Sequence, residues 1–269
     1  MDEHWIGFDA ERDDALALIT VDLAFTEVAP DDRRPHLVRV TIGFNAVLES
    51  GLPDASDLDA VNALEDPLLA RMEATGAAMV GRVITDGRRH FFFYTPDPAA
   101  SEAAATSVLR AVKDRETEVE VAHDPEWEVY SEYLLPSGPE FRRSQDAQVV
   151  RALEHAGDAL EVPRPVDHFI YFAEQPPRDA FARQAREAGF EVEMLEADNV
   201  ADDDEPYGLR LRRTDPVDLD SISAITIELD EAADHAGGRY DGWETIVVNS
   251  DGTPMEVDDD DPEAPPPHN

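Results

Sequence analysis

The side chains with the most evident binding chemistry lie close together near the end of the chain. Tyr240 and Trp243 flank Asp241, and three glycines lie within residues 237–242. Glycine permits sharp turns and close backbone approach, and Tyr and Trp offer an apolar body with a polar tip. Two interpretations are open: Tyr240 and Trp243 either close the core of the domain across the glycine turn, or contact a partner.

Two clusters of aspartates lie before and after this segment, one in a loop and one in the tail. They are Asp202, Asp203 and Asp204, and Asp258, Asp259, Asp260 and Asp261. Together with Tyr240, Asp241 and Trp243, they are the residues that we expect to bind a partner. The tail, residues 250–269, combines a block of like charge with consecutive prolines, so the sequence predicts that it is disordered.

No pattern of residues predicts catalysis. Ser131, Ser137 and Ser144 lie near His123 and His155 in the sequence, but none occupies a nucleophile-elbow motif. The chain has no cysteine, which excludes a thiolate nucleophile, a thiolate metal site and a disulfide framework. The glycine pair at 237–238 follows an expected helix, whereas a phosphate-binding loop precedes one. We therefore expect no catalytic residue and no cofactor.

Metal ligation is also not predicted. His168 follows Asp167, and His235 follows Asp234 and Glu231, but neither group has the spacing of a known metal motif. The acidic loop 198–205 lacks the alternating Asp-x-Asp-x-Asp-Gly layout of a calcium loop. In a chain this acidic, carboxylates next to a histidine are unavoidable, so we expect no metal site.

Charge sets the strongest limit on partners. The 269 residues include 22 Lys and Arg against 61 Asp and Glu, a formal net charge of -39. Such a surface repels nucleic-acid phosphates and anionic membranes, so basic protein partners, divalent cations and a high-salt cytoplasm remain open as explanations of the charge. Lys113 is the only lysine, which is typical of salt adaptation or of a GC-rich genome. No segment resembles a signal peptide or a membrane span, which predicts a cytoplasmic protein.

Hydrophobic periodicity predicts an α+β fold with two α/β sandwich domains and antiparallel sheets. In residues 1–136, the strands expected at 15–23, 36–42, 78–84, 88–94 and 117–121 alternate with two helices. The first helix is expected to begin at Ser56 or Asp57, with Pro67 kinking or dividing it. Asp86-Gly87 predicts a hairpin turn. The consecutive aromatics at 91–94 would point alternately to the two faces of a strand, which favours core packing over RNA stacking.

In the second half of the chain, the pattern predicts a linker helix followed by a single domain. A linker helix is expected within residues 137–162, followed by a domain over 163–249. Strands at 166–172, 190–195 and 207–212, a helix at 177–188, a helix from Asp218 and a last strand after Gly238 give the order βαββαβ. That order is typical of the ferredoxin-like fold.

Residues 163–261 resemble the RraB family, regulators of ribonuclease E activity. The resemblance is carried by three segments, 166–172, 177–181 and 188–192, and most specifically by Tyr240-Asp241-Gly242-Trp243-Glu244-Thr245. It implies a non-catalytic inhibitor that binds the arginine-rich scaffold region of the endonuclease. The first half resembles a family of unknown function that is often fused to an RraB-like domain, and it implies no activity.

Two other functions stay open at the sequence level. One is an enzyme with a site in the first domain or between the domains. Its candidate residues lie beside the hairpin turn, namely Arg88, Arg89, His90 and Tyr94, and a pocket that brings His90 together with the carboxylate of Glu65 or Asp66 would support it. The other is a salt-adapted protein without a single partner. The first hypothesis remains a regulatory or adaptor protein whose acidic surface binds an arginine-rich partner, such as a ribonuclease.

Overall fold

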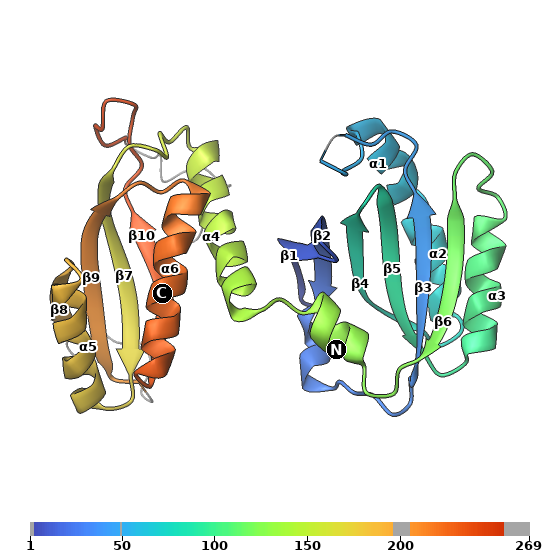
Figure 1. Cartoon of the computed structure of the whole chain (residues 1–269), viewed down its shortest axis with the longest axis horizontal. Helices are drawn as coiled ribbons and strands as arrows, with labels where there is room; N and C mark the ends of the chain where they lie inside the picture. Colours follow the sequence, from blue (N-terminus) through green and yellow to red (C-terminus); the bar gives the residue numbers. More distant parts are fainter. Residues whose placement is uncertain (1–2, 49, 196–204, 256–269) are drawn as a thin grey trace. The chain divides into compact units, whose positions relative to one another are not determined.

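The computed structural model describes residues 3–48, 50–195 and 205–255. The chain divides into two compact units, Met1–Ser144 and Gln145–Asn269, which we call the N-terminal and C-terminal units. Each combines helices with one antiparallel sheet (Figure 1), which confirms the predicted α+β class. No helix within the described ranges is long and apolar enough to span a bilayer.

The N-terminal unit is built on a six-stranded sheet in the order β1-β2-β4-β5-β3-β6. Its strands are β1 (Trp5–Arg12), β2 (Ala15–Asp22), β3 (His36–Gly43), β4 (Ala78–Thr85), β5 (Arg88–Thr95) and β6 (Thr117–His123). The predicted β4–β5 hairpin is confirmed. Asp86 and Gly87 have φ of +46° and +68°, as a tight two-residue turn requires.

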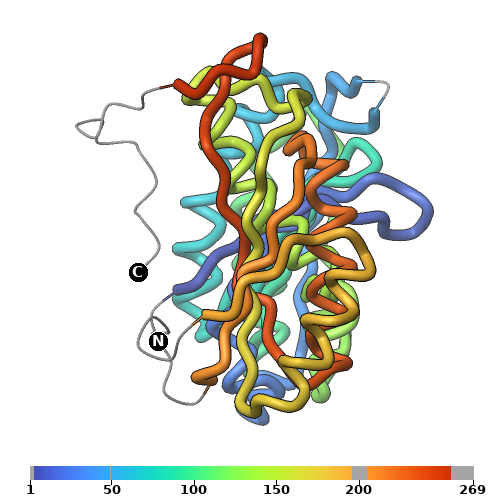
Figure 2. The backbone as a smooth tube through the Cα atoms, turned by 90° about the vertical axis from the view of Figure 1, so that its left-hand side faces the viewer, coloured from blue at the N-terminus to red at the C-terminus, as the bar shows by residue number. Residues whose placement is uncertain are grey.

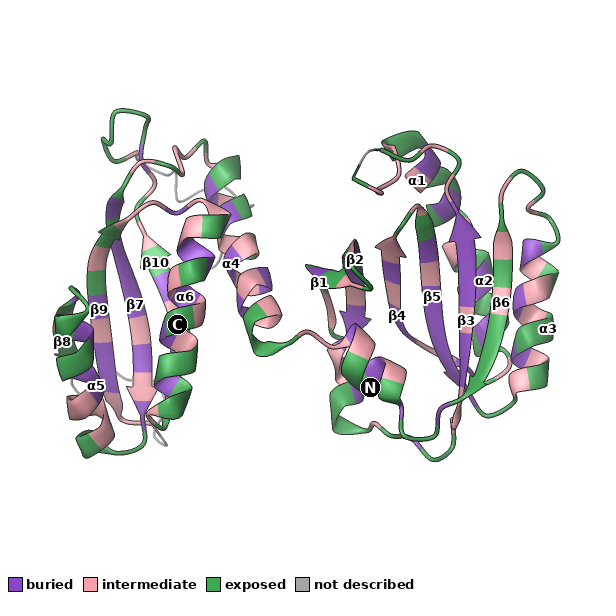
Figure 3. Cartoon of the chain, viewed as in Figure 1, coloured by how far each residue is buried: buried purple, intermediate pink, exposed green. Residues whose placement is uncertain are grey.

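Both faces of this sheet are covered at its centre. Three α-helices pack on one face and two short helices on the other; they are α1 (Ala55–Asn62), α2 (Glu65–Glu73) and α3 (Pro98–Leu109), and the 3-10 helix η1 (Leu23–Glu27) and π-helix η2 (Val129–Leu134). In β5, Phe91 and Phe93 face the α-helices, whereas Phe92 and Tyr94 face η2. The aromatic run is therefore buried on both faces (Figure 3), as strand alternation predicts.

The start of the first helix differs from the prediction. Asp54, and not Ser56 or Asp57, is the N-cap of α1, because its side chain accepts a hydrogen bond from the Asp57 backbone N–H at 2.8 Å. The break between α1 and α2 falls at residues 63–64. Pro67 lies in the first turn of α2, where the missing backbone N–H would have had no helical partner.

The C-terminal unit has a four-stranded sheet in the order β10-β7-β9-β8. Its strands are β7 (Arg164–Phe172), β8 (Glu191–Leu195), β9 (Tyr207–Asp215) and β10 (Gly238–Thr245), and its helices include α5 (Gln175–Glu187) and α6 (Leu219–His235). The elements follow in the predicted order βαββαβ. Assignment to the ferredoxin-like class stays a prediction.

The helices of this unit lie on one face of its sheet. Phe181 of α5 and Leu229 of α6 share a core with Ile170 and Phe172 of β7, and Figure 2 shows the strands on one side of these helices. The helix expected to link the domains is α4 (Gly138–His155), and the division between the units falls within it. Its residues Val150 and Leu153 pack in the C-terminal unit.

Candidate functional site

The segment with the strongest sequence signal is the last strand, β10. It contains Tyr240, Asp241 and Trp243, and a β-bulge interrupts its pairing with β7 between Tyr240 and Gly242. Residues three apart in a regular strand point to opposite faces. The extra residue at the bulge, Asp241, instead allows Tyr240 and Trp243 to face the same, helix-covered side of the sheet. There they are 2% and 6% exposed and pack in two neighbouring buried clusters, Tyr240 with Phe172 and Trp243 with Val150 of α4.

Tyr240 is bound to a buried histidine. Its hydroxyl lies 2.9 Å from Nδ1 of His168, whose side chain is fully buried. Burial lowers the pKa of His168 to about 4 because it penalises the charged imidazolium. Nε2 of His168 has no hydrogen-bond partner among the described residues. The ring is therefore neutral near pH 7, and the pair is part of the core.

Trp243 donates to a buried carboxylate that the sequence analysis did not single out. Its Nε1 lies 2.9 Å from Oδ1 of Asp146 in α4. The other oxygen, Oδ2, accepts from the hydroxyls of Ser223 and Thr226 in α6, at 3.0 and 2.6 Å. Asp146 is 1% exposed, so these three donors compensate its burial. The cluster fastens α4 and α6 to the last strand.

Of the two interpretations of the aromatic pair, core closure is the one that the burial and the hydrogen bonds of Tyr240 and Trp243 support directly. The two glycines before it have different roles: a Cβ on Gly238 would overlap the ring of Phe172, whereas Gly237 provides the turn with a φ of +74°. Asp241 lies on the opposite face of β10, exposed and ion-paired with Arg239. The predicted binding residues Asp202, Asp203 and Asp204, and Asp258, Asp259, Asp260 and Asp261, lie outside the described residues. A binding role for the whole set stays a prediction.

The face of the sheet that Asp241 shares carries charged and aromatic side chains. Pairing places them in three rows across β8, β9, β7 and β10: Glu191, Arg212, Asp167 and Glu244; Glu193, Arg210, Phe169 and Gly242; and Leu195, Gly208, Tyr171 and Arg239. We call this surface the open face. Within it, Arg212 binds Asp167 through Nε and Oδ1 at 2.7 Å, and Arg210 is paired with Glu193.

The residues of the enzyme hypothesis do not converge. Arg89 of β5 faces the α-helices and binds Glu65 at 2.6 Å, whereas His90 points to the other face, 2.9 Å from the hydroxyl of Thr41. Burial, with the charge of Arg39 as a further cause, lowers the pKa of His90 to about 4. The sheet itself therefore separates His90 from the carboxylate of Glu65, with which the enzyme hypothesis pairs it.

Tyr94 belongs to a third, structural group. Its ring stacks on Trp127 with centroids 3.9 Å apart, and its hydroxyl donates to Asp124 at 2.5 Å. Burial and this hydrogen bond raise the pKa of Tyr94, so the phenol stays protonated. Arg88, at the edge of the unit, lies 3.8 Å from Glu116 in an exposed pair.

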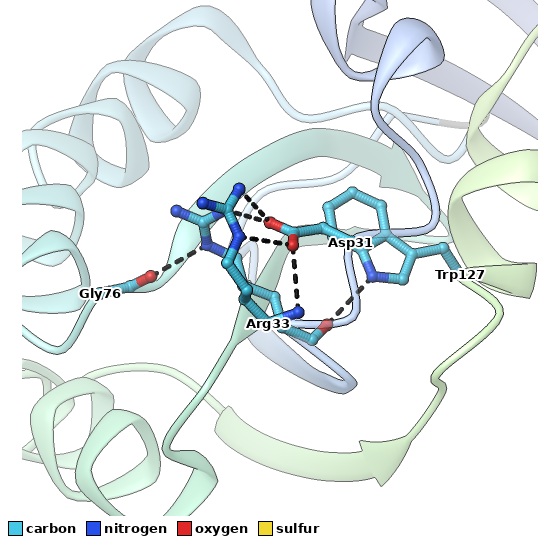
Figure 4. A network of polar contacts seen from close by, with 5 residues as sticks. Asp31, Arg33, Gly76 and Trp127 are labelled. Carbon is cyan, nitrogen blue, oxygen red and sulfur yellow. Dashed lines mark hydrogen bonds and ion pairs between the residues drawn. The ribbon is translucent and has the colours of Figure 1, made fainter.

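A polar network continues from Trp127 (Figure 4). The indole Nε1 donates to the backbone carbonyl of Arg34, and the Arg34 Nε donates to the carbonyl of Gly76 at 3.1 Å. The carboxylate of Asp31 forms ion pairs with Arg33 and Arg34. The hydrogen bond from Arg33 is the main cause that lowers the pKa of Asp31 to about 2. These hydrogen bonds and ion pairs connect loops to one another, so the network has a structural role.

The N-terminal unit also has an open, polar hollow of about 480 Å³ beside the β4–β5 turn. Its lining includes Asp86, Arg88, Glu116 and residues of the loop after β3. Across the described part of the chain, no group of three or more His, Asp or Glu side chains is placed to hold a metal ion. Asp167 and His168, which are adjacent in sequence, point to opposite faces of β7.

Asp146 and the open-face aromatics Phe169 and Tyr171 were not predicted as site residues from the sequence. For the two aromatics a signal was present in the sequence. Side chains in a strand point alternately to its two faces, and positions 169 and 171 are out of phase with the buried positions 166, 168, 170 and 172. Asp146 gave no such signal. It lies in a helix rich in charge, and its partner Trp243 is 97 residues away.

Comparison with known families agrees with the two-part organisation. A family model described as "Regulator of ribonuclease activity B" matches residues 143–245, and one described as "Family of unknown function (DUF695)" matches residues 3–135. A search of curated proteins found no match. Both resemblances stated from the sequence are confirmed: an RraB domain follows a DUF695 domain. The RraB match begins within α4 and so includes Asp146.

Proposed function

Since the second part of the chain is an RraB domain, we propose that the protein is a non-catalytic regulator or adaptor that acts on a ribonuclease through protein–protein contacts. The family match is the observation that carries the proposal. The enzyme we have in mind is an endonuclease of the ribonuclease E type, bound through its arginine-rich scaffold region.

Charge supports this type of partner. The chain has almost three carboxylates for each basic side chain, and the guanidinium groups of an arginine-rich segment bind carboxylates through paired hydrogen bonds. Long-range attraction of this kind speeds association and weakens with salt, because charges are screened beyond about 10 Å at 0.1 M ionic strength. RNA itself would be repelled by the same surface.

The first test is a pull-down with the tagged full chain from a lysate of its own host, at low salt and at the working salt of the cell. We expect recovery of a ribonuclease or of another arginine-rich protein. Recovering no basic partner even at low ionic strength would contradict the proposal.

The second test separates regulation from catalysis. The recovered ribonuclease is purified, and cleavage of a set of transcripts is followed with and without the full chain. We expect the chain alone to cleave nothing and its addition to change which transcripts the ribonuclease cuts. Cleavage by the chain alone, in a preparation free of ribonuclease, would favour the enzyme hypothesis.

A further inference from the structure

The open face of the C-terminal unit is the surface that the fold leaves for contact with another molecule. Helices α5 and α6 pack on the opposite face, and no described element of this unit packs over the open one. Five of its charged residues are exposed, whereas Phe169 and Tyr171 at its centre are half-buried. Aromatic side chains at the centre of an uncovered sheet are typical of a binding surface.

Each of these aromatics lies beside a glycine. Tyr171 pairs with Gly208 of β9, and a Cβ on Gly208 would lie 3.0 Å from Cε1 of Tyr171, so the ring rests on the glycine backbone. Phe169 pairs with Gly242 of β10, where nothing lies within 4 Å of an added Cβ. The flank of Phe169 toward β10 is therefore open, and a planar group can approach its ring there.

The charges around the rings are unequal. Six carboxylates lie on or beside the open face against three guanidinium groups; the carboxylates are those of Asp167, Glu191, Glu193, Glu205, Asp241 and Glu244. Arg210, Arg212 and Arg239 are ion-paired with four of them. Glu191 and Glu244 have no ion-pair partner within the described ranges. The surface therefore has a negative surplus beside an accessible ring.

The open face already contains one example of the contact that such a surface favours. The guanidinium of Arg239 lies 5.5 Å from the ring centroid of Tyr171 while it binds Asp241 and Glu205. A planar guanidinium combines stacking on a ring with hydrogen bonds to carboxylates, which the ammonium of lysine does less well.

From these observations we propose that the open face is the docking site for an arginine-rich peptide segment, with a guanidinium of that segment stacked on Phe169 and paired with Glu191 or Glu244. The proposal rests on the proposed function and specifies which surface of the RraB domain meets the basic partner. Stacking is screened by salt much less than the long-range charge attraction, so this contact retains specificity at high ionic strength.

The test is the affinity of the full chain for a fluorescent arginine-rich peptide, measured by anisotropy over a salt series. A lysine peptide of equal length and charge is the comparison probe. We expect Phe169→Leu, which keeps apolar bulk without a π-face, to weaken arginine-peptide binding about tenfold, the equivalent of a cation–π contact of roughly 1.4 kcal/mol. The same variant should change lysine-peptide binding much less.

The contribution of charge to peptide binding is tested with two matched double variants. Glu191→Gln with Glu244→Gln removes two charges from the open face, and Glu228→Gln with Glu231→Gln removes two exposed charges from α6, which packs on the other face. We expect the first pair to weaken binding several-fold and to reduce its salt dependence, and the second to have a small effect. Thermal unfolding of each variant checks that it is folded.

The outcomes separate this inference from the proposed function. If the peptide binds the chain but the Phe169 and Glu191/Glu244 variants bind it as the unaltered chain does, the docking face is wrong and the function stands. If no arginine peptide binds even at low salt, both fail. If a single-stranded RNA oligonucleotide binds and the Phe169 variant abolishes that binding, the face is a nucleic-acid surface and our proposal is overturned.

Discussion

The central strands of the two units carry aromatic residues in different environments. In the N-terminal unit, β5 is covered on both faces and buries the whole aromatic run 91–94. In the C-terminal unit, β7 buries Ile170 and Phe172 under its helices but leaves Phe169 and Tyr171 half-buried on the open face. The same residue types thus stabilise one sheet and remain available for binding on the other. Whether helices cover one face of the sheet or both, and not the amino-acid composition of the strand, decides which aromatic side chains are buried.

Truncating one ring in each strand gives the largest expected contrast. Phe93→Ala removes a fully buried side chain, and we expect it to lower the free energy of unfolding by about 3–5 kcal/mol. Phe169→Ala should cost about 1 kcal/mol, because its ring keeps contact with water in the folded state. Urea unfolding measures both. Equal costs would show that the open face is covered in solution.

The buried carboxylate tests what holds the covered side of the C-terminal sheet. Asp146→Ala leaves the indole of Trp243 and the hydroxyls of Ser223 and Thr226 without their acceptor. We expect a loss of about 3 kcal/mol, with Asp146→Asn losing less because it keeps one acceptor oxygen. Hydrogen exchange read peptide by peptide should show faster opening of α6 and β10 and an unchanged β5. Unchanged exchange in β10 would contradict this assignment.

Two buried tyrosine hydroxyls compare the polar contacts of the two cores. Tyr94→Phe removes a hydrogen bond to the carboxylate of Asp124, and it should cost about 2 kcal/mol because the bond is charge-assisted. Tyr240→Phe removes a bond to a neutral imidazole, for which we expect about 1 kcal/mol. Chemical unfolding of the two variants checks the order, and the reverse order would contradict the expected difference between the charge-assisted and the neutral hydrogen bond.

Acid should destabilise both units by the same mechanism. His90 and His168 have folded-state pKa values of about 4, below the ordinary 6.5. Between pH 6.5 and 4 the unfolded chain binds a proton at each histidine and the folded chain does not, so stability falls as pH falls. The loss is on the order of 1 kcal/mol per pH unit for each histidine, and it ceases below pH 4.

Single replacements separate this effect from the titration of carboxylates. Unfolding of His168→Gln and His90→Gln is compared with that of the unaltered chain at pH 7 and at pH 5. Each variant should lose less stability over this interval than the unaltered chain does. A pH dependence identical to that of the unaltered chain would show that the pKa of the histidine is the same in the folded and unfolded chains.

Local patterns were enough for many elements of the fold. The alternation at 36–42 and 88–94, the Asp86-Gly87 turn and the helix expected from Asp218 each predicted an element that the structure contains. The cap of α1 was misplaced because Ser56, Asp57 and Asp54 are all competent caps. Asp57 is not the cap because its carboxylate accepts hydrogen bonds from the backbone N–H groups of Asn45 and Ala46, which are contacts outside the helix.

The candidate site was predicted less completely than the fold. Tyr240 and Trp243 stood out by residue type, but a spacing of three in a strand gave no sign that both would lie on the helix-covered side of the sheet. For Phe169 and Tyr171, the sequence indicated only that both side chains lie on the same face of β7. Which phase faces solvent depends on the side of the sheet that α5 and α6 cover, and this is set by packing far along the chain.

By itself the sequence determined the charge, the two-part organisation, the hairpin and the order βαββαβ, because these follow from composition and from periods of two to four residues. Tertiary structure alone decided the bulge at Asp241, the meeting of Trp243 with Asp146 and the exposure of Phe169. The physical reason is distance along the chain. A pairing register, or a carboxylate that satisfies an indole 97 residues away, is chosen by the free energy of the whole packed unit, to which local preferences contribute little.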